Sequence, residues 1–214
     1  MVAASSPNPP TSPAPGPQVV AVAASSGHGF SKQTRPLVRL VEGLGVEGDA
    51  HHGRTVQHLS RIRRAPDEPN LRQVHLIQAE LFQEMLPAGH RVLPGQLGEN
   101  VTTTGLDLLA LPVGTVLLLG DTAEVRLTGL RNPCRQINDL SPGLLKVVVT
   151  RADGVASTSD VTLTPTGGAE SLDGVGIIRK AGVMAVVERG GEVRPGMAIE
   201  VVPPEGPHQP LAPV

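Results

Sequence analysis

The stretch GTVLLLGDTAEVRLTGL, residues 114–130, decides the fold class of this chain of 214 residues. Two runs rich in β-branched and aliphatic side chains flank Gly120 and Asp121, a pair that is typical of a tight turn between antiparallel strands. The stretch therefore predicts a β-hairpin, and the segments on either side of it are interpreted by the same signals.

Further short apolar runs, separated by turn residues, predict more strands. The runs VVAVAAS (19–25) and RQVHLI (72–77) are each predicted to be a strand, and the second leads into a predicted helix at 78–86. The stretch GVMAVVERGGEVRPGMAIEVV (182–202) predicts a second hairpin that turns at its paired glycines. Because the chain holds 25 glycines and many short strand signals, we expect a mainly β fold, a β-barrel with a few short helices.

The length predicts one domain with extensions. Residues 1–18 are rich in proline and serine, and we expect a disordered extension because such a segment buries too little apolar area to offset its chain entropy. The folded domain is predicted to span 19–202, with a flexible surface insertion at 151–174 that is rich in Gly, Ser and Thr. Residues 203–214 are predicted to be a flexible tail.

The composition argues against several classes of partner. Aromatic residues make up 1% of the chain, so it offers almost no stacking platform for single-stranded nucleic acid. A net charge of -2 and a pI near 6.4 give no global attraction to nucleic acid or to an anionic membrane. We find no apolar run long enough to span a membrane and no signal peptide. Together with a single cysteine, these features favour a cytoplasmic protein.

A loop that combines glycines with charged and imidazole side chains is the first candidate site. It reads GVEGDAHHGRTVQH (45–58), and His51 and Arg54 there can donate hydrogen bonds to an anion. A polar loop whose histidines only cap nearby backbone is an equally good interpretation. A zinc site from Asp49, His51 and His58 is a third, although its spacing fits no familiar zinc pattern.

Two further segments carry candidate functional side chains. In PGQLGENVTT (94–103), the Asn100 amide can bind both donor and acceptor edges of a heterocycle, or it can form a turn that leads into a strand. In GLRNPCRQI (129–137), Cys134 lies near two arginines, which favour the reactive thiolate form. A lone cysteine is also often a small buried apolar residue, so the residues around Cys134 leave its role open.

In this order, the motifs FSK (30–32), GVEGDAHHG, GQLGENVTTTGLDLLALPVGTVLLLGD (95–121) and GLRNPC resemble the MOSC domain family, named for the C-terminal domain of molybdenum cofactor sulfurases. The resemblance covers residues 19–202 and is strongest to the small stand-alone bacterial members. It implies a fold built around a β-barrel and the binding of molybdenum cofactor (molybdopterin), a pterin that carries a phosphate. The match places Cys134 at the cysteine that supplies a thiolate ligand to molybdenum in reductase members, which makes it the catalytic residue. It also implies that Asn100 contacts the pterin and that the phosphate is bound by cations, for which the candidates are Lys32, His51, Arg54 and Arg131.

Three functions remain open on this basis. The first is reduction of a small-molecule substrate, an N-hydroxylated compound such as 6-hydroxylaminopurine, with electrons from separate electron-donor proteins. The second is sulfur transfer, with a persulfide on Cys134 that a separate desulfurase supplies. The third is a non-catalytic module that binds a cofactor or an anion, in which Cys134 is only structural.

Overall fold

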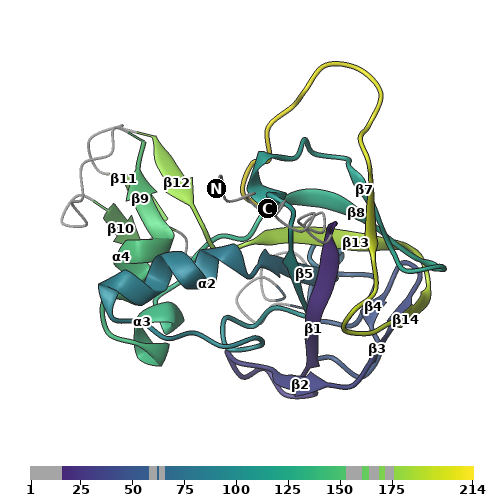
Figure 1. The fold of residues 1–214 in the computed structure, drawn as a ribbon, viewed down its shortest axis with the longest axis horizontal. Helices are drawn as coiled ribbons and strands as arrows, with labels where there is room; N and C mark the ends of the chain where they lie inside the picture. Colours follow the sequence, from purple (N-terminus) through teal and green to yellow (C-terminus); the bar gives the residue numbers. More distant parts are fainter. Residues whose placement is uncertain (1–15, 58–61, 63–65, 153–160, 164–168, 172–175) are drawn as a thin grey trace, which may run out of the picture.

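The computed structural model of the chain describes residues 16–57, 62, 66–152, 161–163, 169–171 and 176–214, and for 161–163 and 169–171 it describes the backbone (Figure 1). Its main feature is an eight-stranded sheet in the order β15-β7-β8-β13-β5-β6-β1-β2. All neighbouring strands in it are antiparallel except the parallel pair β5 and β6. In chain order the strands are β1 (Gln18–Ala24), β2 (Gln33–Arg35), β5 (Val74–Gln78), β6 (Val101–Thr104), β7 (Val116–Leu119), β8 (Ala123–Leu130), β13 (Val183–Arg189) and β15 (Ile199–Val202).

Smaller elements accompany this sheet. One three-stranded sheet packs beside it, and two pairs of short strands lie at the far end of the molecule, next to the helices (Figure 1). The strands are β3 (Val38–Val41), β4 (Gly45–Val46) and β14 (Gly191–Val193), then β9 (Val149–Arg151) with β12 (Ile177–Arg179), and β10 (Val161–Leu163) with β11 (Ala169–Ser171). The helices are α2 (Glu80–Met85), α3 (Gln136–Leu140) and α4 (Leu144–Val148), with the 3-10 turns η1 (Leu86–Ala88) and η2 (Leu108–Ala110).

The hairpin predicted over 114–130 is confirmed. Strands β7 and β8 pair antiparallel, with Leu119 opposite Ala123 and Gly120 in the left-handed region at a φ of 66°. Alternate residues of β8 are buried, which is the pattern of a strand that turns one face to the core. The main core inside the sheet is aliphatic and includes Leu76, Leu117, Leu127, Val183 and Val187.

The second predicted hairpin, over 182–202, is wrong. Strand β13 already has β8 on one edge and β5 on the other, so neither edge is available to the strand that follows it. The chain instead turns at Gly190 and Gly191 and continues as β14, which pairs with β3, before β15 joins β7. A Cβ at Gly191 would meet the Thr122 hydroxyl, so the close approach at this corner requires glycine.

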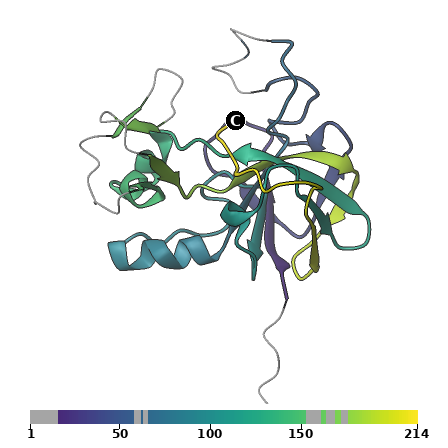
Figure 2. The same ribbon diagram turned by 90° about the horizontal axis from the view of Figure 1, so that it is seen from above.

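The predicted mainly β fold with few short helices is confirmed, whereas the predicted barrel stays a prediction, because no closed ring of strands is found in the described residues. Within the described residues, β15 and β2 are the two ends of the sheet. The segment around β15 nevertheless reaches the start of β1, the neighbour of β2, because Val19 N donates to Met197 O at 2.8 Å and Ile199 N donates to Pro17 O at 2.8 Å. The sheet therefore curls until β1 and the segment around β15 touch, as the view from above in Figure 2 helps to follow.

A second core joins the helices to the sheet. Leu81, Phe82 and Met85 of α2 are buried on one face, as predicted, and they pack with Ile137 of α3 and Leu144 of α4. Helix α2 is shorter than the predicted 78–86 because Gln78 still pairs with β6 and a 3-10 turn begins at Leu86. None of the helices in the described part of the chain has the length and apolar character needed to cross a membrane.

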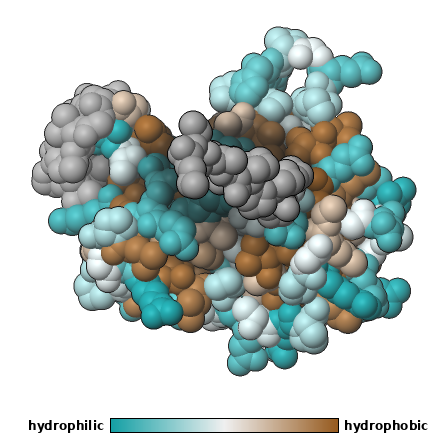
Figure 3. All heavy atoms as spheres, in the orientation of Figure 1, coloured by the Kyte–Doolittle hydropathy of each residue, from teal (hydrophilic) through white to brown (hydrophobic). Residues whose placement is uncertain are grey.

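Of the predicted extensions and the predicted insertion, the structure describes only the C-terminal segment in full. Residues 203–214, expected to be a flexible tail, run back along the sheet, where Val113 N donates to Gln209 O at 2.9 Å and Leu130 N to Ala212 O at 2.8 Å. Their outer bend is hydrophilic (Figures 1 and 3), whereas Leu211 is 8% exposed and joins the main core. Most of the predicted extension at 1–18 and of the insertion at 151–174 lies outside the described residues.

The docked C-terminal segment leads to a stability prediction. Replacing Leu211 by Ala removes a buried side chain and should lower the free energy of unfolding by about 2 to 3 kcal/mol. The matched control is Leu93→Ala, because Leu93 is 52% exposed and its loss should change stability by less than about 0.5 kcal/mol. Denaturant unfolding measures both, and equal effects of the two variants would show that the segment does not dock in solution.

Candidate functional site

Five polar side chains are buried together beside the curled sheet. Lys32, Asp49, Glu99, Asn100 and Arg131 are each at most 9% exposed. Buried charges are tolerated only when they are paired or hydrogen-bonded, so these residues need one another or a ligand. They come from loops far apart in the sequence, and the curl of the sheet brings these loops to one place.

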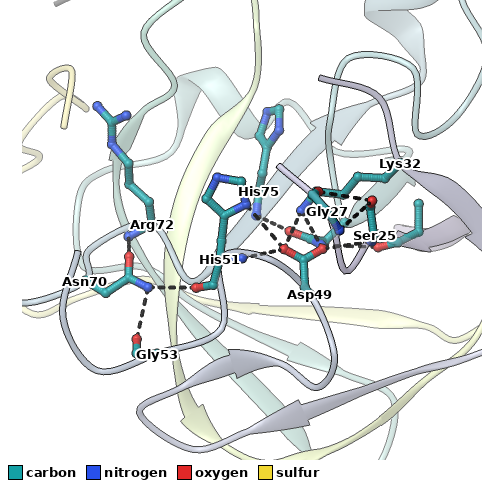
Figure 4. A network of polar contacts seen from close by, with 11 residues as sticks. Ser25, Gly27, Lys32, Asp49, His51, Gly53, Asn70, Arg72 and His75 are labelled. Carbon is teal, nitrogen blue, oxygen red and sulfur yellow. Dashed lines mark hydrogen bonds and ion pairs between the residues drawn. The ribbon is translucent and has the colours of Figure 1, made fainter. Parts of the chain in front are cut away.

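Asp49 is the centre of this cluster (Figure 4). Its carboxylate forms an ion pair with the Lys32 ammonium, at 2.8 Å from Oδ2 and 3.0 Å from Oδ1. It also accepts hydrogen bonds from Ser25 N at 3.2 Å, from His51 N at 3.0 Å and from the Asn100 amide at 3.1 Å. Five donors on two oxygens, counting the His51 ring, leave this carboxylate fully engaged and fixed in place.

These contacts set the charge of Asp49. Burial alone would raise its pKa, but the hydrogen bonds from His51 and the ion pair with Lys32 outweigh burial and hold the pKa well below its usual range. Burial also lowers the pKa of Lys32, and the attraction of Asp49 offsets part of this effect. We conclude that Asp49 is ionised in the folded protein, because both of its oxygens accept hydrogen bonds.

Asn100, predicted to contact a pterin, uses its side chain within the protein. Its Nδ2 donates to Asp49 and to Ala23 O, each at 3.1 Å, and its Oδ1 accepts from His75 N at 3.1 Å. The residue is 2% exposed. The structure thus places Asn100 behind Asp49, where it ties that carboxylate to the strands β1 and β5.

The residues of the histidine loop, 45–58, differ in their relation to the buried cluster. His51 Nδ1 lies 3.3 Å from Asp49 Oδ1, and its ring stacks on that of His28 at 5.9 Å between centroids. Arg54 is exposed, and among the described residues no hydrogen bond or ion pair joins its side chain to the buried cluster. His58, the third member of the possible zinc site, lies outside the described residues, and within these no three His, Cys, Asp or Glu side chains gather as a metal site.

Arg131 and Glu99 are buried near each other, and each has one polar atom that forms no hydrogen bond within the described residues. Arg131 Nη1 and Glu99 Oε2 have no hydrogen-bond partner among the described residues. The other oxygen of Glu99 accepts from Gly95 N and from the Thr102 hydroxyl, and the guanidinium lies 5.4 Å from the centre of the Phe30 ring. Burial raises the pKa of Glu99 and lowers that of Arg131, and the attraction between the two opposes both effects.

Glu99 was not predicted as a site residue, although it precedes Asn100. The sequence did contain one signal for it. Glu99 lies between Gly98 and a strand that is buried, so a buried carboxylate could have been expected there. Gly98 itself needs the left-handed region, with a φ of 81°. A turn this tight directs the Glu99 side chain inward, but the sequence does not show which cation it would meet.

Cys134 lies at the edge of this cluster. It is partly exposed, its Sγ is 3.5 Å from Gln136 Oε1, and its charged form would attract the Arg131 guanidinium. The loop before it is held by Arg179 of β12, whose Nε donates to Asn132 Oδ1 at 3.2 Å. The thiol is therefore partly exposed and lies within electrostatic range of the buried Arg131 guanidinium.

The segment 28–32 connects the two halves of the site. His28 stacks on His51, Phe30 lies against Arg131, and Lys32 pairs with Asp49. Of the predicted residues, the structure thus brings together Lys32, His51, Asn100 and Arg131 as one cluster, with Cys134 at its rim. An unsatisfied buried guanidinium next to an accessible thiol fits an anionic group that is also ligated by sulfur.

Comparison with known proteins supports the assignment of the fold. A family model, that of the MOSC domain, matches residues 51–200. The solved structure of YuaD from Bacillus subtilis has a TM-score of 0.63 at 22% identity, over 86% of this chain and 94% of that one. YiiM from Geobacillus stearothermophilus and YiiM from Escherichia coli both have a TM-score of 0.51, at 16% and 18% identity, over 87% and 90% of this chain and 75% and 73% of theirs. A search of curated protein sequences found no match.

The Lys32–Asp49 pair leads to a second stability prediction. Lys32→Met leaves a buried carboxylate without its cation and should lower the free energy of unfolding by about 3 to 5 kcal/mol. Lys180→Met is the matched control, because Lys180 pairs with Glu84 at the surface, where their side chains are 32% and 49% exposed. Its loss should lower the free energy of unfolding by less than about 1 kcal/mol. Similar losses in the two variants, measured by denaturant unfolding at neutral pH, would contradict the central role of the pair.

A third prediction concerns pH. The pKa of Asp49 is lower in the folded than in the unfolded chain, so its contribution is complete above the unfolded value of about 3.9 and is lost as the pH falls below it. Asp49→Asn should therefore be clearly less stable than the unchanged protein at pH 7, and this difference should shrink progressively from about pH 5 downward. Thermal unfolding of both proteins at a series of pH values measures the difference, and a gap that stays constant down to pH 3 would refute the assignment.

Proposed function

Because the chain belongs to the MOSC domain family, we propose that it binds molybdenum cofactor and reduces N-hydroxylated compounds, 6-hydroxylaminopurine being the type of substrate. The observation that carries this proposal is that a partly exposed thiol, Cys134, lies within electrostatic range of the buried guanidinium of Arg131, whose Nη1 lacks a partner among the described residues. An anionic cofactor with a sulfur-seeking metal satisfies both groups at once.

Each residue of the cluster then has a task. Cys134 would hold the metal as a thiolate, and the nearby Arg131 guanidinium would stabilise that negative charge. The buried Lys32 and the exposed Arg54 would supply positive charge to the cofactor phosphate. Asn100 acts by holding Asp49 in place through a hydrogen bond from its Nδ2, rather than by contact with the pterin.

When bound, molybdenum cofactor supplies the exchange of two electrons with the substrate. The chain itself must orient the substrate, exclude bulk water and deliver protons, because conversion of an N–OH group to N–H with release of water consumes two protons. The electrons come from separate electron-donor proteins of the cytoplasm, which is where we place the protein.

Sulfur transfer is the second candidate function. It is favoured by one observation, that the lone cysteine of the chain is partly exposed next to a cation. In this reaction Cys134 receives sulfur from a separate desulfurase and carries it as a persulfide. The two functions differ in what they bind, because only the first requires stoichiometric molybdenum.

The fourth prediction separates these functions. Protein produced in a host that makes the cofactor should contain close to one molybdenum and one pterin per chain, and Cys134→Ser should lose most of the molybdenum because a hydroxyl is a poor ligand for a soft metal site. Metal analysis and pterin fluorescence measure this. The thermal stability of Cys134→Ser should stay within about 1 kcal/mol of the unchanged protein, since the side chain is not buried.

Other outcomes of this experiment point elsewhere. Absence of molybdenum from both proteins, together with a persulfide on Cys134 after incubation with a desulfurase, would favour sulfur transfer. Absence of both, with a large loss of stability in Cys134→Ser, would favour a non-catalytic module in which the cysteine is structural.

A further inference from the structure

The segment 209–214 covers one edge of β8 at the point where the cysteine loop begins. Within the described residues, the hydrogen bonds from β7 and the turn before it reach along β8 as far as Leu127. Beyond that point, Leu130 N donates to Ala212 O at 2.8 Å, and Val214 N donates to Leu130 O at 3.3 Å. Both backbone groups of Leu130 are thus bonded to this segment, whose end lies beside β8 (Figure 1).

This contact lies at the start of the candidate site. Leu130 is the last residue of β8, and Arg131 and Cys134 follow it in the loop that leads to α3. The opposite edge is fixed at the next residue, since Arg131 N donates to Gly182 O at 3.0 Å. Because the backbone of a strand sets the direction of its side chains, these bonds determine how Arg131 and the loop leave the sheet. The segment 209–214 supplies one of the two edges that do so.

The segment is anchored before it reaches the loop. Leu211 is 8% exposed and belongs to the main core, and Val113 N donates to Gln209 O at 2.9 Å. Two prolines within the segment, Pro210 and Pro213, restrict the conformations of the unfolded chain and so lower the entropy cost of ordering it. The docked position is therefore a formed part of the fold.

Strand β8 has a glycine where the segment packs on it. A Cβ at Gly129 would collide with Ala212 O and would lie 2.6 Å from a methyl group of Val214. The φ of Gly129 lies outside the left-handed region, so its backbone conformation is open to other residues. The glycine is needed for the close approach of the segment rather than for a turn. A methyl group added here therefore acts on this contact.

We propose that the segment 209–214 is a positioning element for the cysteine loop, which it holds in the arrangement that receives an anionic metal cofactor. When the segment is displaced, the Leu130 backbone loses both partners and the start of the loop is fixed on one edge only, through Gly182. This inference rests on the proposed function for the nature of the ligand, but not for the docking or for its effect on the thiol of Cys134.

The docking is tested on the full chain without cofactor. Gly129→Ala should displace the segment, because the atom in the way is a backbone oxygen rather than the end of a flexible side chain. Hydrogen exchange of the Leu130 amide, which Ala212 O protects in the unchanged protein, should become at least about tenfold faster. An unprotected Leu130 amide in the unchanged protein would overturn the inference, since the segment would then not dock in solution.

The effect on the loop is measured through the thiol. Cys134 reacts with an aromatic disulfide reagent to form a mixed disulfide and release a coloured thiolate, and the rate reports how often the loop opens. A loop fixed on one edge opens more often, so Gly129→Ala and Leu211→Ala should react about three- to tenfold faster than the unchanged protein. If both variants react at the unchanged rate, the segment packs on the sheet without positioning the loop, and the inference fails.

Two control variants separate positioning from general stability. The Gln209 side chain is exposed and the residue binds the sheet through its backbone oxygen, so Gln209→Ala should react at the unchanged rate. Val38→Ala removes buried volume from β3, which belongs to another sheet, and should destabilise the fold while the thiol rate stays within about twofold. Equal acceleration in Val38→Ala and Gly129→Ala would show that the effect is global and would overturn the inference.

The consequence for the ligand is measured on protein from a host that makes the cofactor. Gly129→Ala should hold less than about half as much molybdenum per chain as the unchanged protein, because a site that is no longer preorganised binds more weakly. Gln209→Ala should equal the unchanged protein. Full molybdenum in Gly129→Ala would overturn the role of the segment in cofactor binding. Absence of molybdenum from the unchanged protein overturns the proposed function instead, and the exchange and thiol rates still decide whether the segment positions the loop.

Discussion

The burial of one ionised carboxylate, that of Asp49, organises this site. Moving a carboxylate out of water costs several kcal/mol, so the fold must supply partners on both of its oxygens. Those partners come from Lys32, the backbone of Ser25, the His51 residue and Asn100, which lie in separate loops. Each loop is thereby held in one position, and the cluster behaves as a single unit.

The curl of the sheet makes this convergence possible. The loop after β1 carries His28, Phe30 and Lys32, and it crosses from the histidine loop to the cysteine loop. The start of β1, from which this loop follows, is fixed by the hydrogen bond from Val19 N to Met197 O in the segment before β15. The geometry of the site thus depends on backbone hydrogen bonds that lie between strands distant in sequence.

The sequence predicted those parts of the structure that local signals determine. The hairpin 114–130 and the buried face of α2 follow from turn residues and from periodicity, and both are confirmed. Strand partners do not follow from local signals, which is why the second hairpin was wrong: β13 finds both of its neighbours elsewhere. The contacts of residues 203–214 were not predicted for a related reason, because a proline-rich composition does not show that backbone groups such as Ala212 O will pair with a sheet.

In the candidate site, too, the sequence predicted which residues matter but not how their side chains are oriented. Motif order identified the family and pointed to Cys134 and Arg131, and in the structure Arg131 belongs to the buried cluster while Cys134 lies at its rim. The composition of the loops could not reveal that Asn100 faces inward or that Glu99 is a buried counter-charge, since both depend on which side of a turn the chain enters.

Glu99 and Arg131 connect the buried cluster with the anionic ligand of the proposed function. Each has a buried polar atom without a partner in the described residues, an arrangement that costs free energy and is retained in native proteins chiefly where it serves function. Asp49 pairs with Lys32, and Glu99 attracts Arg131 without a direct hydrogen bond in the described residues. Under the proposed function, the Arg131 guanidinium, which lies against Phe30 and whose Nη1 has no partner in the described residues, is the group that an anionic cofactor would meet.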